Sequence, residues 1–131
     1  MTRTKLIRGT AASATALAAI GGALALTTGS SVAAKPKPQV VKLSAVPNQL
    51  KFNTKKLTAK AGLIEIVMTN PSADSNAIGH GIAVQGHGTG PTVFPGKTST
   101  LTVTLKKGTY TFFCPVPGHE AAGMKGTLVV S

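Results

Sequence analysis

The sequence predicts an all-β domain, either a β-sandwich or a small Greek-key barrel. Apolar and polar residues alternate with period two along several short segments, which is the pattern of strands with one buried face. Turn-forming residues are frequent, with 15 Gly and 8 Pro among 131 residues, and they separate these segments. Beyond the N-terminal region, no stretch of useful length shows the 3.6-residue period of an amphipathic helix. Several short strands in about 100 residues favour a sandwich or barrel.

Each expected strand is recognised by its alternation. In chain order, the segments are residues 41–45, 64–68, 80–84, 101–105, 109–114 and 127–130. The clearest of them places Leu101, Val103 and Leu105 on one face and threonines on the other. The Lys-Lys-Gly sequence at 106–108 is typical of a tight turn, so a hairpin is expected between the two strands that flank it.

Residues 1–34 have the pattern of a secretory signal peptide. Three basic residues lie within the first eight positions, and no charge follows until Lys35. The most apolar run, residues 15–26, consists largely of Ala and Gly and is shorter than the ~20 apolar residues that a spanning helix needs. An uncleaved N-terminal anchor is the alternative interpretation of this region.

Small residues before the first lysine of the mature region favour cleavage after Ala33 or Ala34. We therefore expect a signal peptide over residues 1–34 and an exported domain over residues 35–131. The exported domain is expected to be periplasmic, envelope-associated or extracellular, without a membrane span once the signal peptide is removed.

Basic residues outnumber acidic residues by 14 to 3, for a formal net charge of +11. Loss of the three basic residues of the signal peptide lowers this charge to +8. The remaining basic residues are scattered lysines, and the whole chain has only one Tyr and four Phe. No nucleic-acid partner is expected, because bidentate Arg contacts are absent and aromatic stacking is scarce. Two interpretations of the charge stay open: steering toward an acidic partner or an anionic envelope, or a solvated face that aids solubility.

The counts of cysteine and histidine limit the chemistry. One Cys rules out a disulfide scaffold, a four-cysteine zinc site and a two-cysteine dinuclear copper centre. Three His are too few for the larger histidine sets of multicopper oxidases or copper–zinc dismutases. The chain therefore has room for one small site with at most one metal ion.

One loop near the C-terminus carries three side chains that bind soft metals. Four residues separate Cys114 from His119, four more separate His119 from Met124, and Pro and Gly shape the turns between them. His80 offers a second imidazole from an earlier strand. Two imidazoles and a thiolate in a trigonal plane, with a weak axial thioether, form the blue-copper electron-transfer site.

The period-two pattern also predicts where two of these side chains point. Cys114 has the same parity as Phe112, and His80 has the same parity as Ile82. Both are therefore expected to face inward at strand ends and to meet at one end of the sandwich.

With these residues, the sequence resembles the cupredoxins, the family that includes plastocyanin and azurin. The resemblance covers essentially the whole exported domain, through residues 50–53 (Leu-Lys-Phe-Asn), 57–62 (Leu-Thr-Ala-Lys-Ala-Gly), 78–80 (Ile-Gly-His), 110–119 (Tyr-Thr-Phe-Phe-Cys-Pro-Val-Pro-Gly-His) and 123–130 (Gly-Met-Lys-Gly-Thr-Leu-Val-Val). It implies an all-β Greek-key sandwich of the cupredoxin type with one type 1 copper per chain. It further implies equatorial ligands His80, Cys114 and His119 and an axial ligand, Met124.

The individual residues also have ordinary structural explanations. Taken alone, Cys114 could be an inert buried thiol. Likewise, His119 could be a surface histidine, and Met124 could simply fill the core. Their combination at this spacing favours a metal site. His80 is the least specific of the four, because a histidine that opens a strand is often only hydrogen-bonded.

Three further positions, Gly81, His87 and Glu120, also carry expectations about the site. Many cupredoxins have Asn directly after the first His, where its side chain braces the copper loop, but this chain has Gly81. Bracing is therefore expected to come from elsewhere or to be missing. His87, which lies between two glycines, is expected to be exposed and not to bind metal, and Glu120 is expected to be a charge at the rim.

The donor set and the resemblance predict an exported one-electron carrier, not an enzyme, whose copper alternates between Cu(II) and Cu(I). The carrier is expected to be a monomer that meets a redox protein briefly, through a small apolar patch around His119. Two other functions stay open: an envelope copper carrier or storage protein without redox work, and a metal-free secreted sandwich that holds an anionic polymer. An enzyme like nitrite reductase is not expected, because it would need a second copper site and more histidines.

Overall fold

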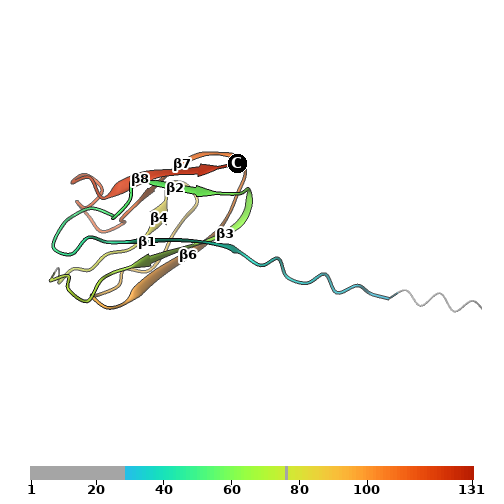
Figure 1. The fold of residues 1–131 in the computed structure, drawn as a ribbon, viewed down its shortest axis with the longest axis horizontal. Coiled ribbons are helices and arrows are strands. Elements are labelled where there is room, and N and C mark those ends of the chain that lie inside the picture. Colours follow the sequence, from blue (N-terminus) through green and yellow to red (C-terminus); the bar gives the residue numbers. More distant parts are fainter. Residues whose placement is uncertain (1–28, 76) are drawn as a thin grey trace, which may run out of the picture. The chain divides into compact units, whose positions relative to one another are not determined.

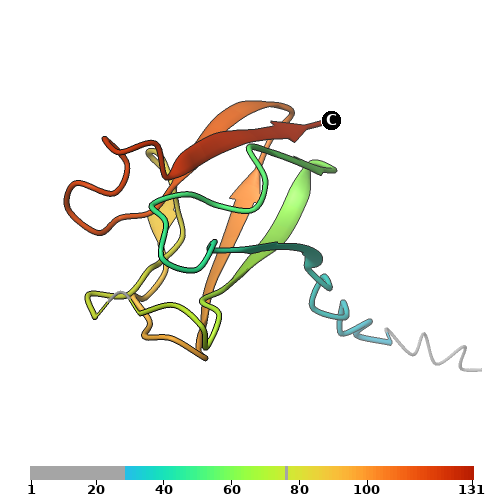
Figure 2. The ribbon, with the colours of Figure 1, turned by 60° about the vertical axis from the view of Figure 1, so that its left-hand side comes forward.

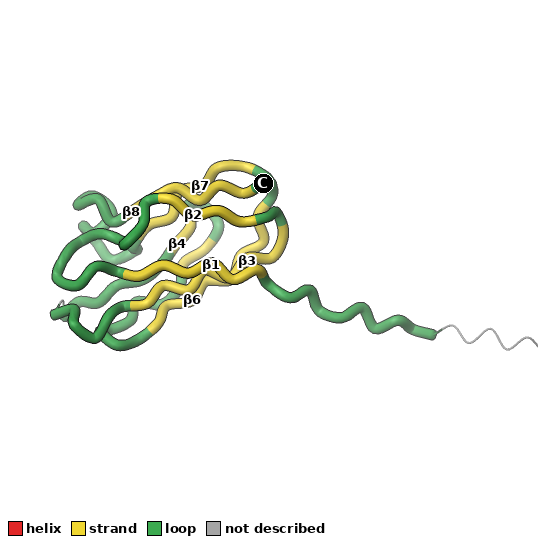
Figure 3. Tube along the Cα trace, in the orientation of Figure 1, coloured by secondary structure: helices red, strands yellow, loops and turns green. Residues whose placement is uncertain are grey.

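Strands and loops, without helices, make up the described part of the computed structural model, residues 29–75 and 77–131 (Figure 3). The strands are β1 (Gln39–Ser44), β2 (Lys56–Ala59), β3 (Gly62–Thr69), β4 (Ala83–Val84), β5 (Gly88–Thr89), β6 (Thr98–Leu105), β7 (Gly108–Phe113) and β8 (Lys125–Val130). They form a three-stranded sheet of order β1-β3-β6 and a five-stranded sheet of order β2-β8-β7-β4-β5 (Figure 1). The all-β sandwich predicted from the sequence is confirmed, with the short strands β2 and β5 in addition to those expected.

The predicted signal peptide lies for the most part outside the described residues, which begin at residue 29. Within the part of the chain that the structure describes, no helix is long and apolar enough to cross a membrane. Residues Ala34–Ser131 form one compact unit by themselves.

The alternation seen in the sequence is the alternation of burial in the structure. In β6 every second residue is buried, so Leu101, Val103 and Leu105 face the core while the intervening threonines are exposed. From the second sheet, Phe112 is fully buried and its ring lies 5.6 Å from that of Phe52. A continuous apolar layer between the sheets therefore stabilises the domain through burial of these faces.

The prediction of a hairpin between β6 and β7 is wrong, because the two strands do not pair with each other. β6 pairs with β3 in one sheet, whereas β7 pairs with β8 and β4 in the other. The turn at Lys106 and Lys107 therefore carries the chain from one sheet to the other, and the hydroxyl of Tyr110 donates a hydrogen bond to the Lys106 carbonyl at 2.8 Å. A turn sequence specifies that the chain reverses, but the partner of each strand is set by long-range packing of its apolar face.

The pairing of β4 with β7 positions the candidate site. These strands are antiparallel, with Ala83 opposite Phe113. The residues just before β4 and just after β7 must therefore lie at the same end of the sandwich, where the loops gather at the left of Figure 1. His80 precedes β4 and Cys114 follows β7, so the register itself brings the two together.

Candidate metal centre

His80 is fixed by its backbone on an inner segment that approaches β4. Its N–H donates to the Val93 carbonyl at 3.0 Å, and its own carbonyl accepts from the Val93 N–H at 2.8 Å. Gly79, with φ of 83°, precedes it, and a Cβ there would lie 2.5 Å from the Val93 oxygen. Only glycine allows this approach. The His80 side chain is fully buried, so the predicted inward orientation is confirmed.

Cys114 lies directly beyond the end of β7 and is 1% exposed. Its Sγ is 4.0 Å from Nδ1 of His80 and 3.5 Å from Nδ1 of His119. The sulfur also accepts the Gly81 N–H at 3.5 Å, and the Val116 N–H points to it as well. Two backbone donors directed at one sulfur favour its thiolate form once a metal binds.

The loop between β7 and β8 folds back so that His119 and Met124 lie beside Cys114. The Met124 N–H donates to the His119 carbonyl at 3.0 Å, and the Cys114 N–H donates to the Met124 carbonyl at 3.0 Å. Gly118 and Gly123 adopt positive φ at the two turns of this loop. Figure 2 shows the loop projecting beyond the strands that it connects. Met124 is fully buried, and its backbone is hydrogen-bonded to both of the other loop residues in the predicted set.

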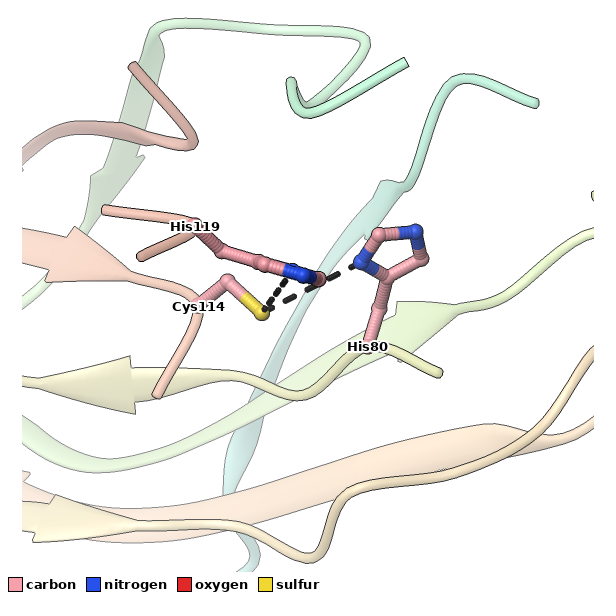
Figure 4. A group of neighbouring side chains, drawn as sticks. All are labelled: His80, Cys114 and His119. Carbon is pink, nitrogen blue, oxygen red and sulfur yellow. Dashed lines mark hydrogen bonds between the residues drawn. The ribbon is translucent and has the colours of Figure 1, made fainter. Parts of the chain in front are cut away.

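The three nitrogen and sulfur donors form one buried group. His80, Cys114 and His119 each direct one donor atom inward, and these atoms all lie within 4.8 Å of one another (Figure 4). Metal bonds of about 2.0 Å to nitrogen and 2.3 Å to sulfur would place donors in a trigonal plane ~3.5–3.8 Å apart. The observed distances of 3.5 and 4.0 Å fit a single ion with small adjustments. A thiolate with two imidazoles is a donor set that suits copper.

Burial changes the pKa values of two of the donors in opposite directions. Burial raises the pKa of the Cys114 thiol, and the Gly81 and Val116 N–H groups offset part of that rise. Burial also lowers the pKa of His119, assisted by repulsion from His80, while the charge of Asp74 acts in the other direction. Without metal, the thiol is therefore protonated near neutral pH, whereas the His119 ring is neutral and ready to bind.

The ring of Pro115 lies where a side chain at position 81 would begin. A Cβ at Gly81 would lie 3.2 Å from both Cγ and Cδ of Pro115 and 3.1 Å from the Pro91 carbonyl. Of the two expectations, bracing from elsewhere or none, this close packing favours the first, and the Gly81 N–H itself donates to the Cys114 sulfur. An asparagine side chain would not fit without displacement of these neighbours.

Asp74 is the site residue that sequence reasoning did not find. Its Oδ2 lies 2.8 Å from Nε2 of His80, on the side away from the donor cluster. The only signal in the sequence is that one of just three acidic residues precedes a predicted ligand. No spacing rule connects the two, because none of the described residues between them, 75 and 77–79, belongs to a helix or strand.

Two further polar residues singled out in the sequence, His87 and Glu120, lie outside the donor cluster. His87 is exposed in the β4–β5 turn, as predicted, and its ring packs edge-on against Tyr110 at 5.0 Å. Glu120 is half-buried beside His119 in the β7–β8 loop.

A buried thiol and two imidazoles at one end of a β-sandwich define a mononuclear metal-binding protein of the blue-copper class. Residues 39–131 match the family model of copper-binding proteins of the plastocyanin/azurin family. The chain belongs to this family, as the resemblance predicted, and its cofactor is one type 1 copper per chain. The sequence matches no curated protein at a significant level.

Solved structures share the fold at low sequence identity. Auracyanin B is 23% identical with a TM-score of 0.64, and the match covers 75% of this chain and 93% of that chain. Auracyanin A, a "blue" copper protein from Chloroflexus aurantiacus, is 22% identical with a TM-score of 0.60, covering 72% and 100% of the two chains. Copper nitrite reductase from Nitrosomonas europaea is 21% identical with a TM-score of 0.59, but the match covers 72% of this chain and only 42% of that chain.

Proposed function

We propose that this protein is an exported one-electron carrier whose type 1 copper is bound by His80, Cys114, His119 and Met124. The observation that carries the proposal is the buried group of one thiol and two imidazoles within 4.8 Å. Copper bound there supplies a reversible Cu(II)/Cu(I) couple. The chain supplies the donors, the rigid frame and the exclusion of water.

The backbone around the donors limits rearrangement between the two oxidation states. Cys114 is tied to Met124, and Met124 to His119, by main-chain hydrogen bonds of 3.0 Å. His80 is held by its reciprocal bridge to Val93. Donors fixed in this way keep one geometry in both states, which favours fast electron transfer.

His119 is the ligand nearest to solvent, although only 5% of its surface is exposed. Exposed Pro117, Ala121 and Ala122 lie in the same loop. This small apolar surface suits brief docking of a redox protein, and the excess of lysines suits an acidic one. In this proposal the carrier works as a monomer in the periplasm, at the envelope or outside the cell, after removal of residues 1–34.

An optical spectrum and electron self-exchange of the copper-loaded protein test the proposal together. An intense thiolate-to-copper band with fast self-exchange is the expected result, and Cys114→Ser removes the band because a hydroxyl is a poor copper ligand. A copper carrier or storage protein would instead show negligible self-exchange and ready release of copper to a chelator. Mass spectrometry of the exported material locates cleavage after Ala33 or Ala34, and an intact membrane-bound chain would contradict export.

A further inference from the structure

His80 has a second buried neighbour on the side away from the donor cluster. Its Nε2 lies 2.8 Å from Oδ2 of Asp74, and both side chains are fully buried. Figure 4 shows Nδ1 of His80 facing Cys114, while the other ring nitrogen points away from the cluster. The imidazole therefore stands between a thiol and a carboxylate.

The connection between β1 and β2 helps to hold Asp74 in place. The N–H of Asn48 donates to Oδ1 of Asp74 at 3.1 Å, and the Asp74 N–H donates to the Pro71 carbonyl at 3.0 Å. The side-chain oxygen of Asn48 accepts the N–H of Ser75 at 2.9 Å and also its hydroxyl. Asn48 makes these contacts with φ of 60°, a conformation that Asn tolerates better than most residues. With Oδ1 engaged in this way, Oδ2 is the oxygen that faces His80.

This arrangement favours one tautomer of His80. A carboxylate only accepts protons, so Asp74 stabilises the ring with its hydrogen on Nε2. That tautomer leaves the lone pair of Nδ1 on the side of Cys114, where a metal ion is expected. The 2.8 Å contact is not a linear hydrogen bond, so its effect arises mainly from the charge. Because both groups are buried, water screens this charge poorly.

We propose that Asp74 is a positioning residue that sets the tautomer of His80 and lowers the reduction potential of the copper site. This inference rests on the proposed electron-carrier function, with Nδ1 of His80 as a ligand. A buried negative charge beside a ligand stabilises Cu(II), the more positive state, relative to Cu(I). A buried carboxylate is costly in an apolar core, and the positive charge of a bound copper ion offsets that cost.

Replacement of the charge tests the effect on the potential. In Asp74→Asn, one oxygen cannot serve both Asn48 and His80, so the variant loses the charge and also the preference for the Nε2 proton. Voltammetry of the copper-loaded protein is expected to show a shift of about tenfold in the Cu(II)/Cu(I) equilibrium toward Cu(I), which is about 59 mV upward for a one-electron couple. Glu65→Gln is the matched control, because it removes the same charge from the middle of β3; it is expected to shift the equilibrium less than twofold.

Nitrogen NMR of the Cu(I) wild-type protein tests the tautomer without any variant. We expect the His80 signals of a ring with its proton on Nε2 and its metal-bound nitrogen at Nδ1. The reverse assignment overturns the proposal even if Asp74→Asn fails to fold. An unchanged potential in Asp74→Asn, or an equal shift in Glu65→Gln, also overturns it. A colourless wild-type protein would instead refute the proposed function, so the two failures are distinguishable.

Discussion

Met124 is the residue whose substitution most directly reports on redox function. A weak axial thioether donates little charge, whereas an amide oxygen is a harder donor that favours Cu(II). We predict that Met124→Gln lowers the reduction potential and that Met124→Leu raises it, with copper bound in both variants. Voltammetry of the three proteins gives the order, and any order other than Leu above Met above Gln would exclude Met124 as the axial ligand.

The buried thiol predicts a proton release when metal binds. Burial raises the pKa of Cys114, so the metal-free protein holds this proton near neutral pH, while the lowered pKa of His119 leaves its ring neutral. Metal binding requires the thiolate. We predict that loading with Co(II), which does not oxidise thiols, releases about one proton per chain near pH 7. The release disappears as the pH rises above the raised thiol pKa, and apparent metal affinity increases up to that point.

Calorimetric titration in buffers of different ionisation enthalpy measures this release. Cys114→Ser is the control and should release no proton. A wild-type protein that releases none near pH 7 would show that the thiol is already ionised.

Gly81 and Pro115 are predicted to act as a pair. A methyl group at Gly81 meets the proline ring at 3.2 Å, so Gly81→Ala should lower the free energy of unfolding by about 1–3 kcal/mol through overpacking. In a Pro115→Ala background the same change should cost less, because the ring is gone. Denaturant unfolding of the two single variants and the double variant measures the coupling, and strictly additive costs would refute the pairing.

At the level of elements, the five-stranded sheet depends on the close approach of Phe112 and of the Lys55 backbone to Gly126 in β8. A Cβ on Gly126 would lie 2.4 Å from Cζ of Phe112 and 2.6 Å from the Lys55 carbonyl. The second neighbour is backbone, which leads into β2 and accepts a hydrogen bond from the Thr127 N–H at 2.8 Å. Residue 126 therefore has to be glycine for β2 and β7 to flank β8.

We predict that Gly126→Ala lowers the free energy of unfolding by about 3 kcal/mol and weakens the β2–β8 pairing. Gly108→Ala is a suitable control, because the atoms nearest to a Cβ there belong to the Tyr110 side chain and lie 3.5 Å away or more, an ordinary van der Waals distance. Thermal unfolding and hydrogen exchange of the β2 amides measure the two effects. Equal stability of the two variants would contradict the close approach.

The connections between strands show which elements the sequence predicts well. The alternation in β6 was sufficient to predict its buried face, because burial of every second residue is a local property of an extended chain. The turn after β6 was not sufficient to predict pairing. The same Lys-Lys-Gly sequence suits a hairpin and a crossing between sheets, and long-range packing selects the crossing.

For the molecule as a whole, the net positive charge should affect how fast charged redox reagents react with it. If the predicted signal peptide is removed, the remaining chain carries a net charge of +8, from the +11 of the full chain less three basic residues. We predict that oxidation of the Cu(I) protein by anionic ferricyanide slows several-fold as ionic strength rises from about 0.01 to 0.5 M. Oxidation by cationic tris(phenanthroline)cobalt(III) should become faster over the same range. Stopped-flow kinetics provide both rates, and equal salt dependence would show that the charge near the site is balanced.

The sequence by itself determined the fold class and the family, and it predicted the candidate donor side chains. Period two along a strand and the spacing of Cys114, His119 and Met124 are local properties, so they are present in the chain before it folds. The inward orientation of Cys114 and His80 followed from the same parity.

Only the tertiary structure decided which strands pair and what surrounds the donors. The β4–β7 register brings His80 to Cys114, the ring of Pro115 packs against Gly81, and Asp74 contacts Nε2 of His80. The first two contacts join residues more than thirty positions apart, and no described residue between Asp74 and His80 belongs to a helix or strand that would set their spacing. No local pattern encodes them, because they arise from the packing of two sheets whose partners are chosen by the burial of all their faces together.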